Sequence, residues 1–277
     1  MQSYKKKKIV HLSSINYYFK IHFILNILYI YIYFIEDFIA NNAEITETFV
    51  GSLSPQAKSI AAIEYLLFKS DLSSTNTEFV NSQNRRDFLK FSSQFLKEQT
   101  DRLQNIWSAT GDDYANTFIN NTSSGIQGSF NRYFNGLHNL VDTGKVTKVG
   151  KPAGLENSAV INPELTQAYF SNTSLDIIKA NMESIEKAYY NPSGLGINDY
   201  VFSIIGNNDL NDLVQIKINE VKAAVDSVPG NLYDAVITHP TEVENLHTKL
   251  EELRILFAVD LQSILSIVIT STDNDGD

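Results

Sequence analysis

Cysteine is missing from the 277-residue sequence. Its absence excludes disulfide bonds, thiolate catalysis, thiolate metal ligands and a lipid-modified cysteine near the N-terminus. Glycine and proline are scarce, at 13 and 6 residues, and the composition is that of an ordinary globular protein. The 22 Lys and Arg residues are outnumbered by 32 Asp and Glu, which gives a net charge of −10. Because binding to phosphates requires a basic face, we expect no nucleic-acid partner.

The first 35 residues differ in composition from the rest of the chain. They contain no glycine, proline or acidic residue, and a cluster of four lysines at 5–8 precedes an apolar run at 21–35. This order is typical of a signal peptide or signal anchor. However, the uninterrupted apolar stretch at 27–35 is about half as long as a membrane-spanning helix. Two other interpretations are a buried element of the fold and a non-native segment translated upstream of a truncated reading frame.

From Glu36 onward, apolar residues recur at spacings of three and four, which predicts amphipathic helices. Pro55 after Ser54 predicts a helix over residues 56–68, and Pro240 is expected to open the last long helix. Only residues 266–270 have a pattern that could form a strand. Two of the longest apolar stripes are formed by Leu175, Ile178, Met182, Ile185 and Tyr189, and by Val243, Leu246, Leu250, Leu253, Phe257, Leu261 and Ile264.

The predicted fold is therefore all-α, with two packed helical bundles joined by short connections. The longest irregular stretch, residues 143–163, is expected to contain the junction between the bundles. We accordingly assign residues 1–35 to an atypical N-terminal segment, 36–145 to the first bundle and 146–277 to the second. No stable membrane span is expected beyond a possible N-terminal anchor.

Four short segments, in this order, carry a resemblance to a known family. Residues 53–68 are similar to a helix with the motif Gly-x-His-x-x-Glu followed by Tyr-Leu-Leu-Phe. Residues 149–155 read Val-Gly-Lys-Pro-Ala-Gly-Leu, residues 168–171 read Ala-Tyr-Phe-Ser, and residues 270–277 form an acidic ending. Together they resemble the imelysin-like family of bacterial cell-envelope proteins. The family's usual N-terminal portion has no visible counterpart, so we expect the first bundle to be incomplete.

The sequence departs from the family motif at the positions that carry chemistry. Ser59 stands at the place of the glycine, Ala61 at the place of the histidine, and only Glu64 is retained. Gln167 occupies a position that is commonly acidic. A His and a Glu three residues apart share one face of a helix and could hold a metal or transfer a proton. Since alanine can do neither, enzymatic activity is not expected, and no catalytic residue is assigned.

The candidate binding residues follow from these segments. Glu64 is the retained motif residue, and Lys151 and Ser171 lie in the second and third matching segments. Asp273 and Asp275 begin an alternating acidic tail, which is too short for an EF-hand loop. The tail is either solvated or supplies carboxylates to a site between the bundles, so a divalent metal would have Glu64 and Asp273 as candidate ligands. The complete set is Glu64, Lys151, Arg132, Ser171, Asp273 and Asp275.

Two histidines of the helical body are interpreted as incidental. His138 lies in a Gly-Leu-His-Asn-Leu-Val segment, with Val where the motif requires Glu, and His247 has no partner at metal-ligand spacing.

The resemblance implies a periplasmic or cell-envelope protein that binds a ligand or a partner connected with iron uptake, without catalysis. A metal-dependent peptidase of the same family is the first alternative. A truncated relic with little activity is the second. The ligand, the metal and any cofactor are not identified by the sequence.

Overall fold

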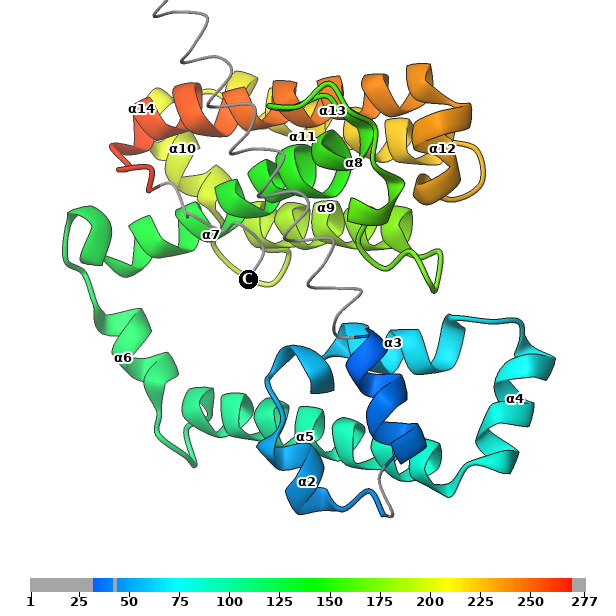
Figure 1. Ribbon diagram of the computed structural model, residues 1–277. Helices are drawn as coiled ribbons and strands as arrows, with labels where there is room; N and C mark the ends of the chain where they lie inside the picture. Colours follow the sequence, from blue (N-terminus) through cyan, green and yellow to red (C-terminus); the bar gives the residue numbers. More distant parts are fainter. Residues whose placement is uncertain (1–31, 42–43, 271–277) are drawn as a thin grey trace, which may run out of the picture. The chain divides into compact units, whose positions relative to one another are not determined.

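The computed structural model describes residues 32–41 and 44–270, and all regular elements within these ranges are helices (Figure 1). This confirms the predicted all-α fold. Contacts divide the chain into two compact units, Met1–Asp112 and Asp113–Asp277. In the part of the chain that the structure describes, no helix is long and apolar enough to cross a membrane.

In the sequence, the boundary between the two units lies between Asp112 and Asp113, whereas the junction was expected between residues 145 and 146. The irregular stretch that suggested this junction begins as a π-helix, η3 (Gly144–Gly150), which directly continues α7 (Ser129–Thr143). It packs against both α7 and α13 (Pro240–Ile255), and therefore lies inside the second unit.

The first unit contains a helix over residues 32–41 and four further helices, each of which begins after a polar N-cap residue. The side chains of Thr46, Ser59, Asp71 and Ser82 each accept a hydrogen bond from the first turn of the following helix. These helices are α2 (Glu47–Ser52), α3 (Ile60–Phe68), α4 (Leu72–Asn81) and α5 (Gln83–Trp107). The helix predicted over residues 56–68 is divided into a 3-10 turn, η1 (Gln56–Lys58), and α3, because the backbone of Ser59 is extended and caps the second part.

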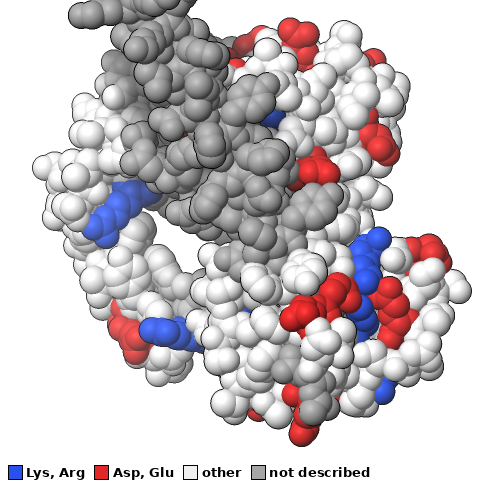
Figure 2. Space-filling model, viewed as in Figure 1, with Lys and Arg blue, Asp and Glu red and all other residues white. Residues whose placement is uncertain are grey.

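A charged cluster, defined here as the Glu36 cluster, connects elements of the first unit. The Glu36 carboxylate accepts hydrogen bonds from Tyr65 Oη at 2.7 Å, Lys69 Nζ at 2.8 Å and Arg85 Nη2 at 2.5 Å. Glu78 lies 3.1 Å from Lys69 and 3.4 Å from Arg85. The Arg85 side chain is only 6% exposed, so these carboxylates are needed to compensate its buried positive charge. Figure 2 shows acidic and basic side chains beside one another on the visible face of this unit.

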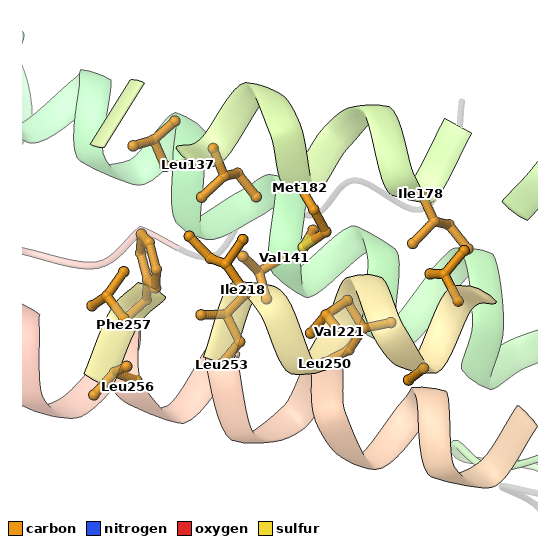
Figure 3. Packing of buried hydrophobic residues seen from close by; sticks show 14 of the residues in the cluster. Leu137, Val141, Ile178, Met182, Ile218, Val221, Leu250, Leu253, Leu256 and Phe257 are labelled. Carbon is orange, nitrogen blue, oxygen red and sulfur yellow. The ribbon is translucent and has the colours of Figure 1, made fainter. Parts of the chain in front are cut away.

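The second unit is built on a bundle of α7, α9 (Ser174–Tyr190), α11 (Asp209–Ser227) and α13. Each of these four helices packs against two others of the set, and their apolar stripes meet in one core (Figure 3). Ile178, Met182, Leu250 and Leu253 are among the fully or almost fully buried residues. The shorter helices are α6 (Tyr114–Asn120), α8 (Lys151–Ala153), α10 (Ile197–Ile205), α12 (Leu232–Thr238) and α14 (Gln262–Leu265), with 3-10 turns η2 (Gly125–Gln127) and η4 (Pro163–Leu165).

A second π-helix, η5 (Leu256–Leu261), follows α13 and shifts the register of the last apolar stripe. A π turn holds more residues than an α turn, because its hydrogen bonds span five residues instead of four. Phe257 and Leu261 are fully buried as the stripe predicts, but the next core residue is Leu265 and not Ile264.

Residues 267–270, which belong to the segment with a strand-like pattern, are held by side chains of a helix; we call them the C-terminal strap. Asn131 Nδ2 donates to Val268 O at 3.0 Å and Val268 N donates to Asn131 Oδ1 at 2.8 Å. Asn135 Nδ2 donates to Val268 O at 2.9 Å, and its Oδ1 accepts from Thr270 N at 2.8 Å. Backbone contacts at alternate residues are characteristic of an extended chain. Two buried asparagines of α7 thus take the place of a neighbouring strand.

Candidate functional site

The helix that resembles the family motif, α3, begins directly after its cap. Ser59 Oγ accepts a hydrogen bond from Ala62 N at 3.3 Å, so the residue at the place of the family's glycine now serves as the N-cap. Ala61 is exposed in the first turn, and Glu64 is half-buried one turn later. The two residues share a helix face, but this face offers one carboxylate and a methyl group.

The other candidates from the sequence lie on separate elements of the second unit. Arg132 is on the exposed side of α7 and donates a hydrogen bond to Gln127. Lys151 is half-buried at the start of α8. Ser171 lies in the turn before α9, where its hydroxyl is 2.8 Å from Thr173 Oγ1. Asp273 and Asp275 are outside the described residues, so their predicted role stays a prediction.

A polar cluster that the sequence did not predict lies beside the segment containing Lys151. Glu156 Oε1 is 2.7 Å from His247 Nε2 of α13, and the same oxygen is 3.0 Å from Lys145 Nζ of η3. The three side chains are 13–15% exposed. We call them the Lys145–Glu156–His247 cluster. It connects two parts of the sequence that are 91 residues apart.

The glycines of residues 149–155 explain how Glu156 reaches this position. Gly154 has a φ of 68°, in the left-handed region that favours glycine, and it turns the chain after α8. Leu155 N then donates to Gly150 O at 2.9 Å. A Cβ atom on Gly150 would lie 2.5 Å from Glu156 Oε1 and 2.8 Å from Lys145 O. The motif therefore creates the space that the Glu156 carboxylate occupies.

Further charges extend the cluster along α13. Arg254 donates from Nε and Nη2 to the two oxygens of Glu251, at 2.7 and 2.8 Å. Its Nε is 3.8 Å from Asp142, and Lys145 is 3.7 Å from Glu251. The hydrogen bonds from Arg254 lower the pKa of Glu251 against the opposing effect of burial, with smaller contributions from Lys145 and His247. The group is thus a set of mutually compensated charges with partial access to solvent.

The chemistry available to this cluster is binding and proton exchange. A carboxylate paired with an imidazole orients the ring, and the adjacent ammonium group gives the carboxylate a further hydrogen-bond donor. In residues 32–41 and 44–270, no three His, Cys, Asp or Glu side chains are grouped as metal ligands. Of the candidate metal ligands from the sequence, only Glu64 belongs to this part of the chain.

Replacing Gly150 by alanine is expected to lower the free energy of unfolding by about 2 kcal/mol, because the new methyl group overlaps Glu156 and a backbone carbonyl. The backbone of Gly150 is itself helical, so the effect is steric. Chemical denaturation measures it. Gly136→Ala is the matched control: no neighbouring atom lies near its Cβ position, and a gain of up to about 1 kcal/mol is expected there. Equal effects of the two substitutions would contradict the close packing of Glu156.

The comparisons with known proteins agree with the resemblance seen in the sequence. The Imelysin family model, peptidase family M75, matches residues 34–257, which is more than half of the chain. The crystal structure of an imelysin-like protein from Psychrobacter arcticum 273-4 is similar, with a TM-score of 0.57 and 20% identity. The match covers 86% of this chain and 68% of that one, and at this identity it concerns the fold. Among curated proteins, no relative matches the sequence. The match to the family model shows that the chain belongs to the imelysin family.

Proposed function

We propose that the chain is a non-catalytic imelysin-family protein of the periplasm or cell envelope, which binds a ligand or partner connected with iron uptake. The observation that carries this proposal is Ala61 on α3, one turn before Glu64. The resemblance places an imidazole at this position. Alanine at this position offers neither a nitrogen ligand nor a base, whereas Glu64 can contribute to binding through charge and hydrogen bonds.

The Lys145–Glu156–His247 cluster supports binding as the role of the second unit. Glu156 packs against Gly150 of a family-like segment, and the three side chains retain partial exposure, with Lys151 close in sequence. Polar groups that are fixed in place and partly exposed can orient a ligand with a smaller loss of side-chain conformational entropy on binding. Ligand binding is therefore expected to depend on Glu156 and His247 as well as on Glu64.

Reintroducing the missing imidazole tests the proposal. We expect Ala61→His to raise the affinity for Zn²⁺ by about tenfold or more over the unmodified chain, because a His and a Glu one turn apart can bind one ion. Isothermal titration with Zn²⁺ measures the change. The control is the double variant Ala61→His, Glu64→Gln, which has the imidazole without the carboxylate and should lose the gain.

Peptide hydrolysis separates the proposal from the peptidase alternative. The unmodified chain should hydrolyse a peptide library no faster than Glu64→Ala. Metal-dependent cleavage by the unmodified chain that Glu64→Ala abolishes would replace the proposal by a peptidase function. The connection with iron is tested in the native host: deletion of the gene should reduce uptake of iron under iron limitation, and unchanged uptake would remove this part of the proposal.

A further inference from the structure

We propose that a pocket of the first unit, between α2 and α5, binds the ammonium group of an aliphatic primary amine, such as a short diamine or a lysine side chain. None of the residues assigned to the proposed function lines this pocket, so the two sites are separate. The features that carry the proposal are two carboxylates that share one neutral donor, the aromatic residues beside them and the size of the pocket.

The pocket lies where α2 packs against α5 (Figure 1). Phe91, Gln94, Phe95 and Glu98 line it from α5, and Glu47 and Gly51 line it from α2. The four residues of α5 are at positions i, i+3, i+4 and i+7, which share one face of a helix. The volume of the pocket is about 260 Å³. Since sites for drug-sized ligands usually exceed about 300 Å³, this pocket suits a small molecule or a single side chain.

Two carboxylates of the pocket depend on one neutral hydrogen-bond donor. Gln94 Nε2 donates to Glu47 Oε1 at 3.0 Å and to Glu98 Oε1 at 3.4 Å. The two charged groups are therefore neighbours, and among the described residues neither forms an ion pair. They repel each other, and the amide between them carries no charge to compensate this repulsion. An ammonium group in the place of the amide nitrogen would form stronger, charge-assisted hydrogen bonds with both carboxylates.

The aromatic residues of the pocket are already in contact with ammonium groups of the chain itself. Lys58, which is 5% exposed, donates to Gly51 O, and its Nζ atom lies 4.0 Å from the centroid of the Phe95 ring. Lys90 Nζ lies 5.0 Å from the centroid of the Phe91 ring. Both rings thus attract cations, and the methylene groups of an alkyl amine can be buried against half-buried rings of this kind.

The charge of the pocket distinguishes an amine from other small ligands. Glu47 and Glu98 would repel a carboxylate or a phosphate. A divalent metal ion takes about six or more oxygen ligands, and within the described part of the chain no third His, Cys, Asp or Glu joins these two as a metal ligand. The net charge of −10 raises the local concentration of small cations around the protein. An organic cation therefore matches the groups that line the pocket.

Isothermal titration of the full chain with 1,5-diaminopentane tests the site. We expect saturable binding that Glu47→Gln and Glu98→Gln each weaken about fivefold or more, because each variant removes one of the two charges. Glu44→Gln is the matched control, since it makes the same change at an exposed residue outside the pocket and should leave the affinity unchanged. 1-Pentanol has a similar carbon chain without the charge and should not bind measurably, a comparison that requires no variant to fold.

Removal of the shared amide gives a change in the opposite direction. Gln94→Met retains the length of the side chain but has no donor, so a bound amine no longer displaces the hydrogen bonds of Gln94. The affinity for 1,5-diaminopentane should rise about threefold. An affinity equal to or below that of the unmodified chain would mean that the ammonium group does not bind between the two carboxylates.

A second ligand distinguishes the two sources of the amine. N-acetyl-lysine methylamide presents the side chain of a protein lysine, whereas 1,5-diaminopentane carries a second ammonium group. Tighter binding of the lysine derivative assigns the pocket to a partner protein, and tighter binding of the diamine assigns it to a free diamine. The proposal is overturned if neither compound binds, if binding is retained in the double variant Glu47→Gln, Glu98→Gln, or if Ca²⁺ binds to these carboxylates more tightly than both amines.

Discussion

Replacement of Phe257 by alanine is expected to lower the free energy of unfolding of the second unit by about 4 kcal/mol. The Phe257 side chain is fully buried in η5, with its ring centroid 5.5 Å from that of Phe134 and 6.2 Å from that of Tyr189. Truncation removes a large apolar surface and leaves a cavity between aromatic rings of α7 and α9. Hydrogen exchange of the α13 amides under native conditions measures the loss in this unit.

Val259→Ala is the matched control for Phe257. It lies in the same π-helix, two residues further on, and is 57% exposed. Substitutions of exposed residues usually change stability by less than about 0.5 kcal/mol. If the two variants lose similar stability, the effect belongs to the π-helix itself and not to burial of the Phe257 ring.

The second large effect is expected in the first unit, where Glu36→Gln should lower the free energy of unfolding by about 3 kcal/mol. The substitution retains the shape of the side chain but removes the charge that compensates Lys69 and Arg85. An almost fully buried guanidinium that loses its closest carboxylate retains the cost of its desolvation. Fluorescence of Trp107, the chain's single tryptophan and the last residue of α5, reports unfolding of this unit in urea.

The pH dependence of this effect has a definite sign. Burial raises the pKa of the Glu36 carboxyl, but hydrogen bonds from Lys69, Tyr65 and Arg85 outweigh it, so the net pKa is below its ordinary value of 4.5. A lowered pKa stabilises the fold above the unfolded-state value, and this contribution is lost as pH falls through the folded-state value. The stability difference between the unmodified chain and Glu36→Gln should therefore shrink below pH 4.5. Asp37→Asn, on the same helix, is the control and should change stability little, because among the described residues the Asp37 carboxylate accepts a hydrogen bond from Asn41 and not from Lys69 or Arg85.

Helical periodicity predicted the second unit well and the first unit less well. Ile178, Met182 and Ile185 are buried as expected, since a regular stripe on α9 faces a complete bundle. On α5, Phe88 is buried while Leu103 of the same helix is 57% exposed. Spacing identifies the apolar face of a helix but does not tell how much of this face another element covers.

The candidate site was predictable only in part. The segment at residues 149–155 borders the Lys145–Glu156–His247 cluster, whose grouping the sequence did not predict, and the role of Lys151 stays a prediction. The contacts of this cluster depend on a π-helix and on a turn at Gly154, and neither has a periodic signal in the sequence. The sequence feature that could have indicated this cluster is the pair Gly150 and Gly154 followed by Glu156. His138 was interpreted as an incidental histidine on a helix face, and the structure buries its side chain on α7.

The π-helix η5 makes the geometry of the C-terminal end dependent on chain length. A π turn forms when a continuous helix accommodates one inserted residue, and each residue of a helix corresponds to a rotation of about 100°. Deleting one residue, such as the exposed Val259, would return η5 to α-helical register and rotate all that follows by this angle. Leu265 would leave the core, and the chain would depart from Ser266 on a different side, away from Asn131. One extra residue in η5 therefore acts as an angular adjustment, which directs the C-terminal strap onto α7.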